Sequence, residues 1–360
     1  MQTSLNTFLE NKMRKFNIEK TSTETRNLLI EKIDNLTKPK GSLGVLESLA
    51  LQIGLIQNSL SPKLVRPTHI VFAADHGISD ENISLSPKEI TYQMVYNFLE
   101  GGAGVNFLAR QHNFKLCVVD MGVDYIFPDD LEVVNTKIAR GTENYLYRSA
   151  MTIAQAEQAI ECAALLVDKE AEQGSNIISF GEMGISNTSA SSIWMHFLTG
   201  IDLKECVGAG SDHTGGIIEH KYDVLKRSVD NYLSKNGAKD PVDIMCYFGG
   251  FEMVAAVGAM LRAAELKMTI LVDGFIMTAC AMMASKLNPN FLDYAIFGHE
   301  GDETGHKAML RALNVKGILH LSLRLGEGTG AICAFPIVDS AVRMINEMST
   351  FSKAEVTKYI

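Results

Sequence analysis

A short apolar run that ends in Asp or Gly, followed by a helical pattern, recurs along this chain of 360 residues. The runs are continuous rather than alternating, which is typical of strands buried on both faces of a sheet. A strand, a glycine-rich turn and a helix repeated in this order predict βαβ units and therefore a parallel sheet. The expected strands are residues 69–75, 115–120, 176–180, 243–248, 268–273 and 317–323, with 294–297 as a further candidate.

The helical patterns predict two domains. Residues 152–169 form an amphipathic stretch with Thr152 as its N-cap candidate, and helical patterns without a convincing strand fill residues 1–60. Residues 339–360 are again helical in pattern. We therefore expect an α/β fold. A large domain at 61–338 contains a parallel sheet flanked by helices and carries the active site, and a small helical domain is built from 1–60 and 339–360.

Composition excludes several classes of protein. The net charge of −9 argues against nucleic-acid binding, which normally needs a basic face. None of the six cysteines is paired at CxxC spacing and most lie in apolar runs, so a disulfide framework or structural zinc site is not expected. The first twenty residues lack the apolar core of a secretory signal, and the longest uncharged apolar stretch, 274–284, is too short to cross a bilayer. We expect a cytoplasmic protein without a membrane partner.

Polar residues and glycines follow every expected strand. In open parallel sheets, ligands bind at the carboxyl ends of the strands. Any one of these turns is explained by ordinary turn and capping chemistry, but six of them in one sheet favour a ligand site at that edge. The turns begin at Asp75, Asp120, Gly181, Gly249, Asp273 and Gly326.

The turn after residues 317–323 presents a single carboxylate, Glu327, between Gly326 and Gly328, with Arg324 upstream. Glycines let a backbone approach a ligand closely and adopt conformations that other residues avoid. Because Leu325 and a second leucine flank it, Glu327 could have a raised pKa and act as a general base. Taken alone, the turn favours a solvated carboxylate, and only the rest of the chain favours the general base.

Two glycine-rich segments are candidates for phosphate binding, because such turns expose backbone N–H groups and the positive end of a helix dipole. Residues 181–191 (GEMGISNTSAS) are the better candidate, since Ser186, Asn187, Thr188 and Ser189 add donors, and residues 208–216 are the second. Neither segment matches G-x-G-x-x-G, and the chain has no P-loop. A nucleotide monophosphate is therefore favoured over a dinucleotide or ATP.

Two other functions remain open at this stage. Asp75, His76, His299 and His306 supply oxygen and nitrogen ligands, which would suit a metal-dependent nucleotide hydrolase. The chain lacks the H-E-x-x-H motif, and charged loop residues are usually solvated, so we predict no metal. A non-catalytic nucleotide-binding regulator is the third possibility.

Several motifs occur together in one order over nearly the whole chain. With them, the chain resembles the nicotinate-nucleotide–dimethylbenzimidazole phosphoribosyltransferase family, which acts in assembling the lower ligand of cobalamin. The motifs are LTKPKGSLGVLE at 36–47, ADHG at 74–77, SPK at 86–88, ARG at 139–141, GEMGISNT at 181–188, GGF at 249–251, DGF at 273–275 and RLGEGTGA at 324–331.

The resemblance implies a reaction and an assembly. Members transfer the phosphoribosyl group of nicotinate mononucleotide to a benzimidazole nitrogen, release nicotinate and form α-ribazole 5′-phosphate with inversion at the anomeric carbon. The family fold is a Rossmann-like parallel sheet with a small helical domain from both chain ends. The resemblance also implies a homodimer in which the partner completes each active site, and no metal or redox cofactor.

The resemblance also implies roles for individual residues. Glu327 is the family's general base, and Glu182 matches a carboxylate that stabilises positive charge or orients the base. Two departures, Met94 and the segment 211–220, leave the acceptor open among dimethylbenzimidazole, adenine and phenolic compounds. The substrate-binding residues are expected to be Gly184 and Asn187 for phosphate or ribose, Lys221 and Arg324 for an anion, Ser86 and Met183 for the aromatic base, and Gly326 for close backbone approach.

Overall fold

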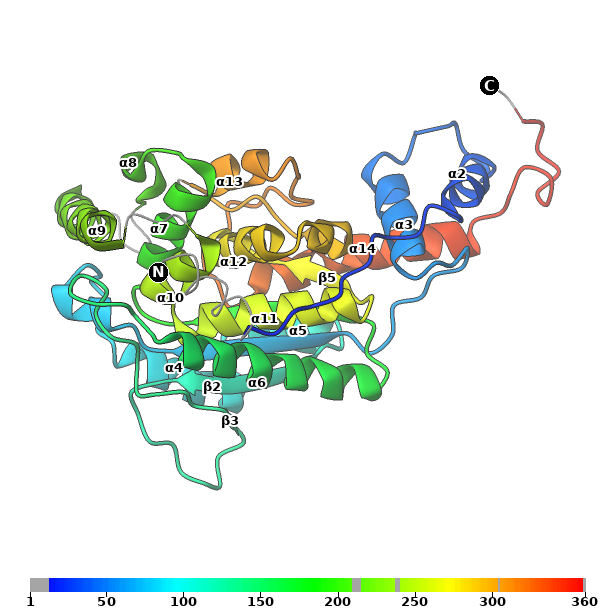
Figure 1. Cartoon of the computed structure of the whole chain (residues 1–360). Helices are drawn as coiled ribbons and strands as arrows, with labels where there is room; N and C mark the ends of the chain where they lie inside the picture. The colour runs from blue at the N-terminus through cyan, green and yellow to red at the C-terminus, as the bar shows by residue number, and fades with distance from the viewer. Residues whose placement is uncertain (1–12, 209–214, 237–239, 304, 359–360) are drawn as a thin grey trace.

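The computed structural model describes residues 13–208, 215–236, 240–303 and 305–358, and it contains a six-stranded, all-parallel sheet (Figure 1). The strand order is β3-β2-β1-β4-β5-β6. This arrangement confirms the expected α/β class with a parallel sheet flanked by helices. The strands are β1 Thr68–Ala74, β2 Lys115–Gly122, β3 Val134–Asn135, β4 Ile177–Met183, β5 Thr269–Val272 and β6 Ala295–Phe297.

Helices cover both faces of the sheet, which explains why the strand sequences are continuously apolar. All seven residues of β1 are buried. Ile70 and Phe72 belong to one hydrophobic cluster, whereas Val71 and Ala73 belong to another on the opposite face. The helices are α2 Arg26–Asp34, α3 Val45–Ile56, α4 Ile90–Glu100, α5 Gly104–Gln111, α6 Ile153–Glu172, α7 Asn187–Thr199, α8 Leu203–Cys206, α9 Gly215–Asn236, α10 Pro241–Phe248, α11 Phe251–Glu265, α12 Phe275–Leu287, α13 His306–Ala312 and α14 Thr329–Glu347, with 3₁₀ turns at Gly77–Glu81 and Pro289–Tyr294.

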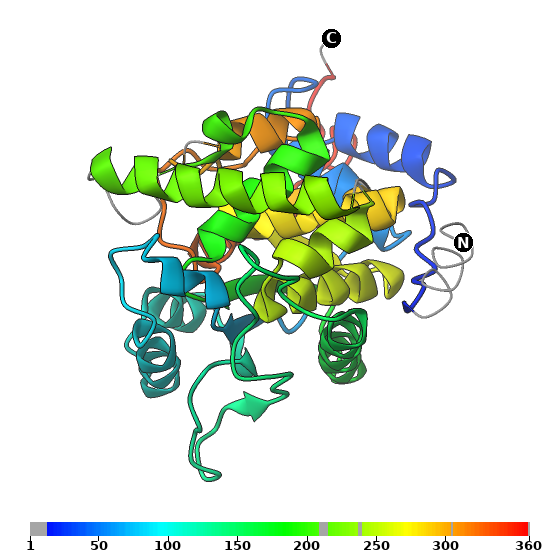
Figure 2. The same cartoon turned by 60° about the vertical axis from the view of Figure 1, so that its left-hand side comes forward.

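Helix α6 begins where the sequence predicts it. The Thr152 hydroxyl accepts a hydrogen bond from the Gln155 backbone N–H at 3.2 Å, and the Gln155 side chain accepts the Thr152 N–H at 2.9 Å. This reciprocal capping box satisfies two amide groups that the first turn leaves unpaired. Figure 2 shows the long helix α9 crossing the side of the molecule, and the segment around β3 projecting from the sheet edge.

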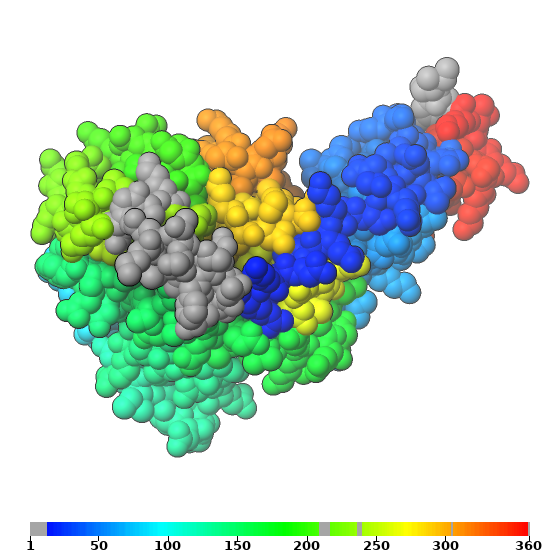
Figure 3. Space-filling model, in the orientation of Figure 1, coloured from blue at the N-terminus to red at the C-terminus, as the bar shows by residue number. Residues whose placement is uncertain are grey.

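Helices α2 and α3 pack against the C-terminal part of α14 and the residues that follow it. Leu29 of α2, Ile53 of α3 and Ile345 of α14 belong to one hydrophobic cluster, and Leu36 forms an antiparallel bridge with Thr350. Figure 3 shows these segments side by side at one end of the molecule. A small helical domain bounded at residues 60 and 339 stays a prediction. Within the described residues, no helix combines the length and apolar character needed to cross a bilayer.

Two expected strands were wrong. Residues 243–248 form α10, because the Asp240 side chain caps the backbone N–H of Val242 at 2.9 Å and Pro241 occupies the first turn. A buried apolar run of this length fits either a strand or a helix. The Asp240 N-cap is the feature that indicates the helix. Residues 317–323 contribute only a bridge between Leu319 and His299, and Leu321 is 53% exposed. The short strand β3 was missed.

Candidate active site

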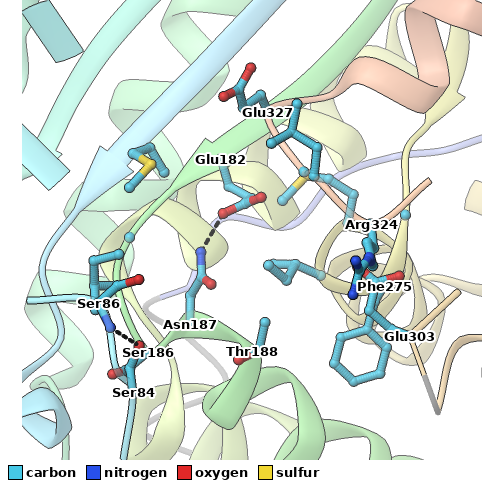
Figure 4. A pocket seen from close by; sticks show the side chains of 18 of the residues that line it. Ser84, Ser86, Glu182, Ser186, Asn187, Thr188, Phe275, Glu303, Arg324 and Glu327 are labelled. Carbon is cyan, nitrogen blue, oxygen red and sulfur yellow. Dashed lines mark hydrogen bonds between the residues drawn. The ribbon is translucent and has the colours of Figure 1, made fainter. Parts of the chain in front are cut away.

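A cavity of about 280 Å³ opens at the carboxyl ends of β4 and β5, the edge that the sequence predicts (Figure 4). Segments far apart in the chain meet there, and every residue predicted for catalysis or substrate binding lines it. The individual roles of these residues stay predictions. They are Ser86, Glu182, Met183, Gly184, Asn187, Lys221, Arg324, Gly326 and Glu327.

Glu327 lies in an unusual turn. Gly326, Glu327 and Gly328 all have left-handed backbone conformations, with φ of +84°, +62° and +86°. For a glutamate this conformation costs roughly 1–2 kcal/mol, so surrounding contacts must maintain it. The Glu327 Oε2 atom accepts a hydrogen bond from the backbone N–H of Val105 at 2.9 Å, at the N-terminus of α5. Burial nevertheless raises the pKa of Glu327 above its usual value.

Asp273, directly after β5, anchors the same turn. Its Oδ2 accepts the backbone N–H of Gly328 at 3.2 Å, and its Oδ1 accepts that of Ala331 at 3.0 Å. His299 Nε2 lies 3.3 Å from Asp273 Oδ1. Burial opposes ionisation of Asp273, but this histidine holds the pKa of the carboxyl below its usual value. A carboxylate therefore ties the Glu327 turn to the end of the central sheet.

Glu182, at the end of β4, supplies the second carboxylate in the cavity. It is buried, and the Asn187 side-chain amide donates a hydrogen bond to its Oε2 (Figure 4). Burial, together with the nearby Glu252 and Asp273 carboxylates, raises the pKa of Glu182 to about 8. Glu182 therefore holds a proton at neutral pH when no cation is bound beside it.

The N-terminus of α7 forms one corner of the cavity, called here the anion corner because its groups suit an anion. The Oγ atoms of Ser186 and Ser189 are buried, and in the described part of the chain neither has a hydrogen-bond partner. Lys221 reaches this corner from α9 and donates from Nζ to Thr188 Oγ1 at 3.0 Å. Backbone amides, hydroxyl groups and an ammonium group at a helix N-terminus suit a phosphate. Most of the second candidate loop, residues 209–214, lies outside the described residues.

Apolar residues form the side of the cavity nearest Ser84 and Ser86. Ile83, Ile90 and Met94 line this side, and apolar side chains of this kind are typical of sites for flat aromatic rings. Sequence reasoning missed Phe275, which lies beside Arg324 and Glu303 in Figure 4. Phe275 directly follows the turn at Asp273, at the end of an expected strand. This position could have identified it, because residues after the other expected strands were taken as candidates for the ligand site.

The four side chains considered for a metal site are held by separate protein partners. His76 Nε2 pairs with Glu252 Oε1 at 2.6 Å, and Asp75 Oδ2 accepts the Asp124 backbone N–H at 2.7 Å. His299 pairs with Asp273 as above. His306 accepts the Gly301 backbone N–H at 2.8 Å and contacts Thr278 Oγ1 at 2.9 Å. Among the residues described, no three His, Cys, Asp or Glu side chains gather as metal ligands.

Comparison with known proteins agrees with this geometry. A phosphoribosyltransferase family model matches residues 18–356. The chain is 59% identical over 347 residues, 96% of its length and 100% of the relative's, to the nicotinate-nucleotide–dimethylbenzimidazole phosphoribosyltransferase of Phocaeicola vulgatus. It is 45% identical to the Dechloromonas aromatica protein of that name, with coverage of 96% and 99%. The crystal structure of CobT from Thermus thermophilus superposes with a TM-score of 0.89 at 34% identity, with coverage of 93% and 100%. The chain therefore belongs to this phosphoribosyltransferase family.

Proposed function

We propose that the protein transfers the phosphoribosyl group of nicotinate mononucleotide to 5,6-dimethylbenzimidazole, or a related base, and releases nicotinate. One observation carries the proposal: two buried carboxylates, Glu327 and Glu182, share a cavity with an anion-binding helix N-terminus. The names of the relatives support the same reaction. The resemblance also implies a homodimer, and we propose that state for this chain.

The transfer needs one proton acceptor. The lone pair of one benzimidazole nitrogen forms a bond to the anomeric carbon, while the bond from that carbon to the pyridinium nitrogen breaks and its electron pair returns to nicotinate. The proton on the other benzimidazole nitrogen passes to the Glu327 carboxylate. The Val105 N–H fixes one carboxylate oxygen, and Oε1 can then face the acceptor. A raised pKa brings Glu327 closer to the working pH and makes it a better base.

Glu182 stabilises the positive charge of the reacting sugar. Nicotinate mononucleotide carries a pyridinium cation, and the transition state spreads this charge over the ribose. A carboxylate in a cavity closed off from bulk water interacts with such a charge more strongly than it would in water. Binding of the cation favours ionisation of Glu182, so substrate binding and loss of the Glu182 proton are coupled.

We expect kcat/KM for nicotinate mononucleotide to rise with pH up to about 8. The reason is the sign of the Glu182 shift: the pKa of about 8 leaves the group protonated below that pH, and only the ionised form attracts the cation. Initial rates measured from about pH 6 to 9 check this. Glu182→Gln should abolish this rising limb, and retention of the limb in that variant would contradict the assignment.

The pH dependence of thermal stability provides an independent test of the ionisation of Glu182. Its pKa is near 4.5 in the unfolded chain and about 8 in the fold, so the folded state binds the proton more tightly. The stability that this proton contributes is present below about pH 4.5 and is lost as pH rises through 8. The Tm of Glu182→Gln relative to the native protein should therefore increase between about pH 5 and 8.

Lys221→Met should raise KM for nicotinate mononucleotide by about 10- to 100-fold, because a charge-assisted hydrogen bond is worth about 1.5–3 kcal/mol. The matched control is Lys226→Met on the same helix. Lys226 pairs with Asp230 at 2.6 Å, but both side chains are more than half exposed, so the pair contributes little. Equal KM values for the two variants would remove Lys221 from the phosphate site.

The reaction itself is tested by chromatography. Nicotinate mononucleotide is incubated with dimethylbenzimidazole, benzimidazole, adenine or a phenol, without added metal. A new ribotide with an equal amount of nicotinate supports the transfer and identifies the acceptor. If the mononucleotide is unchanged with every acceptor, the proposed reaction is wrong.

A further inference from the structure

We propose that His69 is a positioning residue that holds the Glu327 turn in its working conformation. The proposal rests on the proposed function, in which Glu327 is the base. His69 lies on the central strand β1 with 0% of its surface exposed, and it does not belong to the cavity lining. It therefore acts on the reaction only through other residues.

Two hydrogen bonds define the state of the His69 ring. Nε2 lies 2.8 Å from the Glu327 carbonyl oxygen, and Nδ1 lies 2.7 Å from Ser179 Oγ. A carbonyl oxygen can only accept, so Nε2 carries the hydrogen, and Nδ1 accepts from the Ser179 hydroxyl. Ser179 is paired with His69 in the register of β1 and β4. Burial lowers the pKa of His69 to about 4, so this neutral tautomer persists at neutral pH.

The Glu327 turn needs such a contact. The carbonyl held by His69 and the carboxylate that takes the proton belong to one residue, and that residue has a φ of +62°. Asp273 holds only the amides that follow it, at Gly328 and Ala331. His69 is the contact that fixes the peptide carbonyl of Glu327 itself. The same peptide group donates its Gly328 N–H to Asp273, so His69 and Asp273 hold its two ends. Without His69 only the N–H end is held, and the group can tilt and shift the carboxylate relative to the acceptor.

The packing around the ring supports a specific role for His69. A Cβ atom on Gly328 would lie 2.0 Å from His69 Cε1. A Cβ atom on Gly181, in β4, would lie 2.1 Å from the Glu327 carbonyl oxygen and 2.8 Å from His69 Nε2. The turn, the ring and the strand are therefore in direct contact, and glycine is the residue that allows the approach.

Two amide substitutions separate positioning from simple packing. The longer side chain of His69→Gln can place an N–H donor near the Nε2 position, whereas the amide of His69→Asn reaches only the Nδ1 position beside Ser179. His69→Leu keeps much of the volume without a donor. We expect kcat of the Gln variant to stay within about fivefold of native, and kcat of the Asn and Leu variants to fall about 10²-fold. KM for nicotinate mononucleotide should change little, because the anion corner at α7 is unaltered.

A double-mutant cycle completes the test. In the Glu327→Gln background, His69→Asn should lower kcat no further, because His69 acts through Glu327. Equal losses in the Gln and Asn variants, or a full additional loss in the double variant, would overturn the positioning role. An active Glu327→Gln single variant would instead contradict the proposed base. The Gln and Asn pair keeps the test valid if the Leu variant does not fold.

Discussion

Glu327→Gln should lower kcat by about 10²- to 10⁴-fold, the range that a positioned general base contributes. The amide cannot take the acceptor proton, but its oxygen can still accept the Val105 N–H, so the turn should keep its conformation. KM for nicotinate mononucleotide should stay near the native value, because in the proposed reaction Glu327 contacts the acceptor rather than the phosphate. Initial rates of ribotide and nicotinate formation measure both constants.

The matched control is Glu355→Gln. Glu355 is also a glutamate in the left-handed region, with a φ of +54°, but it is exposed near the end of the described chain. This substitution should leave kcat unchanged. If Glu327→Gln keeps kcat within a few-fold of native, Glu327 does not take the proton.

The sheet could be predicted because its strands are buried on both faces. Five of the expected runs overlap observed strands, and they form the continuous apolar stretches that this burial requires. The error at 243–248 shows the limit of predicting strands from continuous apolar runs. A buried helix presents the same apolar run, and only the Asp240 cap distinguishes the two. The error at 317–323 has a different cause, since Leu321 is exposed and Leu319 and Leu323 are only partly buried.

Many of the residues lining the cavity could be predicted because they follow expected strands or match motifs of the family. The contacts that position them could not, since they join residues far apart in the chain. His69 and Glu327 are separated by 258 positions, and Val105 and Glu327 by 222. A histidine within an apolar strand, such as His69, has the sequence pattern of an ordinary core residue. No local pattern links it to the distant Glu327 turn. The raised pKa values of Glu182 and Glu327 likewise depend on burial, which the sequence does not quantify.

Gly181→Ala should lower both activity and stability. Its Cβ would lie 2.1 Å from the Glu327 carbonyl oxygen and 2.4 Å from the Glu327 carbonyl carbon, which are backbone atoms that cannot rotate away. The turn must shift by an ångström or so, and a displacement of this size costs about 10²-fold in rate. Strain in a packed site should also lower the free energy of unfolding by about 1–3 kcal/mol. Initial rates and thermal unfolding measure the two effects.

Gly200→Ala separates lost activity from lost stability. Gly200 ends α7 with a φ of +77°, and a Cβ there would meet nothing within 4 Å. The left-handed conformation makes alanine cost about 1 kcal/mol at this position, but the turn that holds Glu327 is untouched. We therefore expect both variants to be less stable and only Gly181→Ala to lose kcat. If Gly181→Ala kept native kcat despite a lower Tm, the contact between β4 and the Glu327 turn would have no part in positioning the Glu327 carboxylate.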